Sequence, residues 1–116
     1  MADRRVALIP GRGYDTWYAL PGRGARLPAV WLTSLLHRPE VVDALDRATA
    51  PFLPVGGTAD SSWNGPLAQR LTPYVVEITD ADHSLIVPGP LARSAEALGR
   101  VCTALEDFLA GRALAH

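Results

Sequence analysis

The chain has 116 residues, of which 48% are hydrophobic and 20% are charged, and its net charge is -1. This length fits one domain with a single core, and the near-neutral charge gives no electrostatic reason to expect a nucleic-acid or membrane partner. No apolar stretch approaches the ~20 residues that span a bilayer, and the N-terminal apolar run is too short for a signal peptide. We therefore expect a cytoplasmic protein whose partner is a small molecule or another protein.

Three elements are predicted in the first half of the chain. Residues 4–10 (RRVALIP) predict a buried strand that runs into a glycine turn, and residues 15–26 predict a loop interrupted by proline and glycine. Residues 29–33 predict a second buried strand. Residues 38–50 predict a helix, because Pro39 stands in its first turn and apolar residues recur on one face.

The second half repeats this alternation of strand and helix. Residues 50–60 repeat the pattern of a strand that runs into glycine, and Pro54 within the strand favours an edge strand or an irregular one. A short helix over 65–73, a strand over 74–79 and a long helix over 92–111 that stops at Gly111 complete the predicted elements. The order predicts a single α/β domain over residues 1–116, with a mostly parallel sheet of about four strands between two helical layers.

The single cysteine, Cys102, excludes an intrachain disulfide and a cysteine-rich metal site. It lies on an apolar face of the long helix, so we expect it in the core. His83, Asp82 and Asp80 are possible metal ligands, but no histidine-rich spacing accompanies them. We expect neither a metal nor another cofactor.

Polar residues follow the carboxyl end of each predicted strand, where α/β sheets bind their ligands. Asp60 follows the third strand and His83 follows the fourth, 23 residues later. If the strands are parallel, the two side chains meet at one rim, and a carboxylate on one imidazole nitrogen raises the basicity of the other. Two alternatives remain open: Asp60 caps the next helix, or His83 is an ordinary loop residue. The adjacent Asp80 and Asp82 are expected to shape the turn.

Four stretches of this sequence carry a resemblance: PAVWLTSLL, PFLPVGGTADSSW, DADHSL and ALEDFL. Together they resemble the C-terminal half of small bacterial α/β-hydrolase-fold proteins. The resemblance implies that Asp60 is the acid and His83 the base of a catalytic triad. The segment VALIPGRGY resembles the first strand and glycine loop of that family, which implies a substrate-binding role for Gly11, Arg12, Gly13 and Tyr14.

The sequence departs from that family where the nucleophile belongs. Residues 11–28 contain no serine or cysteine, and they are too few to hold the strands and helices that normally intervene. Ser34, at the end of the second strand, is the candidate replacement, with a turn-capping role as the alternative. Trp63 and Ser84, next to the acid and the base, complete the expected substrate site. The lost strands leave apolar edges such as 6–10 or 30–34, so we expect a homodimer through sheet or apolar-face contact.

Two functions follow from these features. The first is an enzyme in which the Asp60 and His83 pair acts on an apolar small molecule, by ester or lactone hydrolysis or by proton-transfer or cyclisation chemistry. The second is a catalytically inactive relative that binds a ligand or a partner. The retained acid and base favour the first, and the missing serine favours the second.

Overall fold

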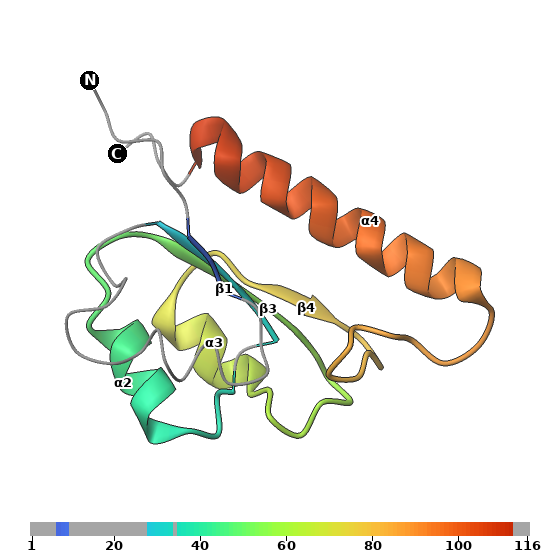
Figure 1. The fold of residues 1–116 in the computed structure, drawn as a ribbon, viewed down its shortest axis with the longest axis horizontal. Helices are drawn as coiled ribbons and strands as arrows, with labels where there is room; N and C mark the ends of the chain where they lie inside the picture. The colour runs from blue at the N-terminus through green and yellow to red at the C-terminus, as the bar shows by residue number, and fades with distance from the viewer. Residues whose placement is uncertain (1–6, 10–27, 34, 113–116) are drawn as a thin grey trace.

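The computed structural model describes residues 7–9, 28–33 and 35–112. Within them, four parallel strands form one sheet in the order β1 (Ala7–Ile9), β2 (Ala29–Leu32), β3 (Phe52–Gly57) and β4 (Val76–Ile78). The helices are α2 (Pro39–Asp46), α3 (Gly65–Leu71) and α4 (Leu91–Asp107), and α4 continues into one wider turn, η1 (Phe108–Arg112). In Figure 1, α2 and α3 lie on one side of the sheet and α4 on the other. The predicted three-layer α/β fold is confirmed.

The alternation of side chains along the strands divides the interior into two clusters. In β2, Ala29 and Trp31 face α2 and α3, whereas Val30 faces α4. The neighbouring strand follows the same period, with Phe52 on the first side and Leu53 on the second. Every residue of β3 is buried, as the continuous apolar run of a parallel strand between two helical layers requires.

Pro54 lies in the interior strand β3 and is completely buried, so the prediction of an edge or irregular strand is wrong. The register shows why the proline is tolerated. The carbonyl of Val55 accepts from β2, so the backbone of Pro54 faces the opposite side, towards β4. Pairing with β4 begins only at Val55, opposite Val76. The missing N–H of Pro54 therefore costs no hydrogen bond of the ladder.

The helices also end differently from the prediction in one place. Helix α2 stops at Asp46 rather than continuing to residue 50, because Pro51 disfavours a helical conformation at the residue before it. The helical run formed by α4 and η1 stops at Gly111 as predicted, since Gly111 adopts a φ of 101° that glycine accepts without strain. None of the helices in the described part of the chain is both long and apolar enough to cross a membrane.

Two further predictions about exposure need correction. Cys102 is exposed and does not lie in the core. The apolar face of α4 is wider than the part that packs against the sheet, where only Ala97 and Val101 of the helix are buried. The second strand is not a sheet edge, because β2 lies between β1 and β3. The described edges of the sheet are β1 and β4.

Candidate acid–base site

The candidate site lies at the carboxyl rim of the sheet, in the turns after β3 and β4. The Asp60 backbone N–H donates to the carbonyl of Gly57, which closes a tight turn directly after β3. The Asp60 Oδ1 atom accepts from the Ser62 N–H at 2.8 Å, a side-chain turn that fixes the carboxylate. Helix α3 is capped instead by Asn64, whose side chain accepts from the Leu67 N–H. The alternative that Asp60 caps this helix is therefore wrong.

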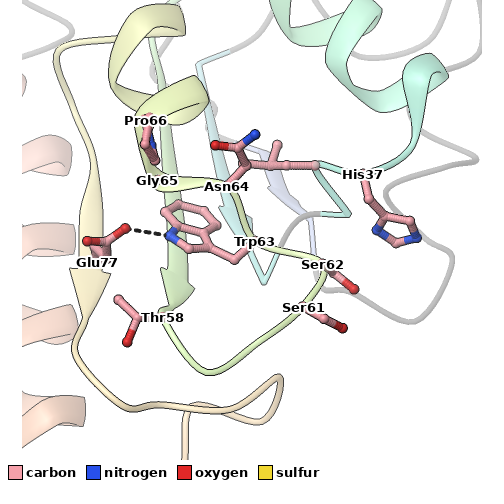
Figure 2. A pocket seen from close by; sticks show the side chains of 10 residues that line it. His37, Thr58, Ser61, Ser62, Trp63, Asn64, Gly65, Pro66 and Glu77 are labelled. Carbon is pink, nitrogen blue, oxygen red and sulfur yellow. Dashed lines mark hydrogen bonds between the residues drawn. The ribbon is translucent and has the colours of Figure 1, made fainter.

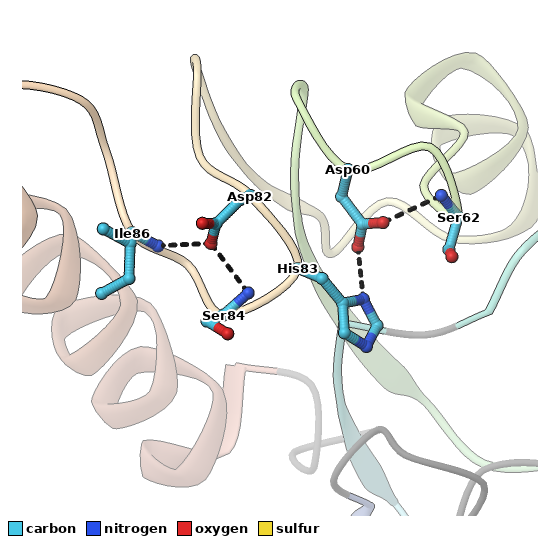
Figure 3. Close-up of polar contacts among 6 residues, drawn as sticks. All are labelled: Asp60, Ser62, Asp82, His83, Ser84 and Ile86. Carbon is cyan, nitrogen blue, oxygen red and sulfur yellow. Dashed lines mark hydrogen bonds and ion pairs between the residues drawn. The ribbon is translucent and has the colours of Figure 1, made fainter.

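His83 reaches this carboxylate from the turn after β4. Its Nδ1 atom lies 2.7 Å from Asp60 Oδ2 (Figure 3). The Asp60 side chain is only 3% exposed, whereas 39% of the His83 side chain is exposed. Each carboxylate oxygen of Asp60 thus has a partner, one a backbone N–H and the other the imidazole. The predicted contact between Asp60 and His83 is confirmed, and its role in catalysis stays a prediction.

The turn that carries His83 is fixed by its own hydrogen bonds. Asp82 Oδ1 accepts from the backbone N–H groups of Ser84 and Ile86, at 2.8 and 3.0 Å (Figure 3). The Asp82 N–H in turn donates to the carbonyl of Ile86. Leu85 takes a φ of 62°, a left-handed conformation that is rare for a branched side chain and is held by these bonds. Asp82 therefore shapes the turn, as predicted.

The two turns are also joined to each other on the side away from the imidazole. Thr58 Oγ1 accepts from the Asp80 N–H at 2.7 Å, and the Ala59 N–H donates to the carbonyl of Ala81. A Cβ atom at Gly57 would stand 2.2 Å from that same carbonyl oxygen, so only glycine fits at the end of β3. Thr58 was marked in the sequence only by its place at a strand end, yet its side chain fixes the separation of the acid and base turns.

The geometry determines which imidazole nitrogen is available for chemistry. A deprotonated Asp60 only accepts hydrogen bonds, so Nδ1 of His83 carries the proton and Nε2 carries the free lone pair. Among the described residues, no side chain is hydrogen-bonded to Nε2. A substrate or a water molecule that reaches the exposed ring can therefore donate a proton to that atom.

A neighbouring pocket of about 390 Å³ is lined by the loop before α3 and by β4 (Figure 2). Trp63 forms one wall, and its Nε1–H donates to Glu77 Oε2 at 2.8 Å. Its ring lies against Gly56, where a Cβ atom would come within 2.1 Å of it. Neither Asp60 nor His83 lines this pocket. Trp63 therefore fastens the loop that carries the acid, a role that sequence reasoning missed.

The other predicted site residues fall into two groups. Ser84 is exposed and lines a mostly apolar cleft of about 260 Å³ between its turn and α4. The replacement nucleophile, Ser34, and the predicted glycine loop, Gly11, Arg12, Gly13 and Tyr14, lie outside the described residues. Within the described ranges, no three histidine, cysteine or acidic side chains gather in an arrangement for a metal ion.

Comparisons with family models, with curated proteins and with solved structures give no match for this chain.

Proposed function

We propose that the protein is an enzyme in which His83, held by Asp60, acts as a general base on an apolar small molecule such as an aryl ester or a lactone. The observation that carries the proposal is the contact of 2.7 Å between a carboxylate that is 3% exposed and an imidazole that is 39% exposed. A buried acid beneath an accessible imidazole is the arrangement that general-base catalysis requires.

The reaction that fits this pair best is direct hydrolysis by an activated water. The Nε2 atom of His83 takes a proton from water as the water oxygen bonds to the substrate carbonyl carbon, and the carbonyl π electrons move to its oxygen. Collapse of the tetrahedral intermediate breaks the bond to the leaving oxygen, which receives the proton from Nε2. Asp60 stabilises the imidazolium formed between these two transfers. This route needs no covalent acyl-enzyme, in keeping with the absence of serine and cysteine from residues 11–28.

The motifs around the pair add support of a different kind. The segments that hold Asp60 and His83 resemble those that supply the acid and the histidine in α/β hydrolases, and their order along the chain agrees. Esters and lactones are typical substrates of such pairs. An alternative use of the same base is proton abstraction in an isomerisation or cyclisation.

The test is a screen of aryl esters and lactones with a matched pair of histidine variants. His83→Ala removes the base, and His37→Ala removes an imidazole that stands before α2 and does not contact Asp60. A general base contributes about 10²–10⁴-fold. We expect His83→Ala to lower kcat/KM by that factor and His37→Ala to leave it within about twofold. Equal activity of the wild type and His83→Ala, with both folded by circular dichroism, would refute the proposal.

A second function is favoured by the absence of serine and cysteine, the usual nucleophiles of α/β hydrolases, from residues 11–28. In this function the rim binds an apolar ligand without turning it over. The two functions are separated by adding a hydrolysable ester and its ether analogue, which lacks the carbonyl, to the wild type. Turnover of the ester supports the enzyme. A higher melting temperature of the protein with both compounds, without any turnover, supports the binding protein.

A further inference from the structure

Helix α4 carries a second apolar surface beside the one that it packs against the sheet. Leu91, Leu98 and Leu109 are 85%, 59% and 53% exposed. With Ala95, Cys102 and the half-buried Leu105 they form a series whose spacing along the chain alternates between four and three residues. We call these six residues the α4 stripe. This alternation is the heptad pattern with which one helix packs along another.

Apart from Leu105, which also packs against the cluster over β3 and β4, the stripe lies outside the face that anchors α4 to its own domain. The anchoring residues are Ala97, Val101 and Phe108, which join the cluster over β3 and β4. At 100° per residue the centre of the stripe lies about 100° around the helix from theirs. In Figure 1, α4 forms the outer layer of the molecule on its side of the sheet. Ile86, which is 51% exposed and lines the cleft next to Leu98, extends the apolar surface beyond the helix.

We propose that the α4 stripe binds the α4 stripe of a second copy of this chain in an antiparallel pair. The sequence of the stripe favours this occupant because it is self-complementary when reversed. A two-fold axis at the level of residue 100 places Leu91 opposite Leu109 of the second copy, Ala95 opposite its Leu105 and Leu98 opposite its Cys102. The two small residues, Ala95 and Cys102, then each face a leucine of the second copy. Large and small side chains alternate in this way where two helices interlock.

One feature of the helix surface fits the same arrangement. Gly99 lies next to the stripe in the middle of α4, and a Cβ atom there would contact nothing within 4 Å. An exposed glycine inside a helix costs about 0.5–1 kcal/mol relative to alanine. No contact of Gly99 within its own domain offsets that cost, whereas close approach of a second helix near the two-fold axis makes use of the missing side chain.

The size of the surface sets the expected strength. From Leu91 to Leu109 the stripe is about 28 Å long and about 10 Å wide. This is less than about 300 Å² on each partner, below the standard size of specific interfaces, so we expect a weak dimer that forms only at high protein concentration. The inference does not depend on the proposed catalytic role, because no residue of the stripe belongs to the acid–base pair.

The first experiment measures the mass in solution by sedimentation velocity over a concentration series that ends at about 1 mM, because the small contact area predicts a weak dimer. We expect twice the 12.4 kDa of one chain for the wild type. Leu98→Glu places a charge in the centre of the stripe and is expected to give the monomer mass. Thr103→Glu places the same charge on the exposed opposite side of α4 and is expected to stay dimeric. A monomeric wild type, or a dimeric Leu98→Glu, overturns the proposal.

The second experiment tests the antiparallel direction and does not depend on the stability of Leu98→Glu. In a Cys102→Ser background, Leu91→Cys combined with Leu109→Cys is expected to form a covalent dimer on oxidation. The two positions in one chain are about 27 Å apart and cannot pair with each other. Leu91→Cys alone is expected to remain monomeric on a non-reducing gel. A covalent dimer from Leu91→Cys alone indicates parallel helices and overturns the antiparallel assignment.

Discussion

Gly56 lies beneath the indole of Trp63, and its replacement by alanine tests how the acid loop is fastened to the sheet. The new methyl group would stand 2.1, 2.2 and 2.7 Å from three carbons of the indole, so the ring has to move by more than 1 Å. Forced overpacking of this kind costs about 1–3 kcal/mol. The displaced ring also weakens the hydrogen bond of 2.8 Å from Trp63 Nε1 to Glu77, which adds about 1 kcal/mol at this partly exposed position.

We therefore expect Gly56→Ala to lower the free energy of unfolding by about 2–4 kcal/mol. Trp63→Ala removes the obstacle, so in that background Gly56→Ala is expected to cost less than about 1 kcal/mol. Urea unfolding followed by far-UV circular dichroism measures all four proteins of the cycle, because this signal does not depend on Trp63 fluorescence. Equal costs of Gly56→Ala in the two backgrounds would contradict the close contact between ring and backbone.

Two other substitutions test hydrogen bonds at the two ends of the sheet, one at the start of β3 and one at the carboxyl rim. The buried hydroxyl of Thr72 donates to the carbonyl of Phe52 at 3.0 Å. Thr72→Val is therefore expected to lower the free energy of unfolding in urea by about 1–3 kcal/mol, and Thr72→Ser, which keeps the hydroxyl, is expected to lower it less. Equal losses of stability in the two variants would show that the hydroxyl does not contribute. Asp82→Ala removes the acceptor for the Ser84 and Ile86 N–H groups, so their amide hydrogen exchange is expected to accelerate by about tenfold or more, and Asp82→Asn, which keeps an oxygen, is expected to change it less. Unchanged exchange in Asp82→Ala would mean that the turn is held by other contacts.

The sequence predicted the parts of this structure that depend on regular periods. Apolar runs marked all four described strands, and the strand–helix order predicted a mostly parallel sheet. That inference carried the most information about the site, because parallel strands end at one rim. It brought Asp60 and His83 together across 23 residues, and the structure has them 2.7 Å apart.

The wrong predictions share a cause, which is that local patterns do not reveal the neighbours of an element. Pro54 argued for an edge strand, but its tolerance depends on where pairing with β4 begins. Cys102 lies on the apolar arc of α4, but the width of that arc does not say which part meets the sheet. The sequence left open whether Asp60 caps α3. In the structure its carboxylate binds His83 and the Ser62 N–H, and Asn64 caps the helix.

The central claim is that the Asp60 carboxylate holds the His83 ring with its proton on Nδ1 and its lone pair on Nε2. Long-range 1H–15N correlation spectra of the imidazole, recorded where the ring is neutral, distinguish a protonated nitrogen from a bare one. We predict a protonated Nδ1 and a bare Nε2 for His83 in the wild type, and a mixture of both tautomers in Asp60→Ala. A wild-type ring with the proton on Nε2, or spectra that Asp60→Ala leaves unchanged, would contradict the account.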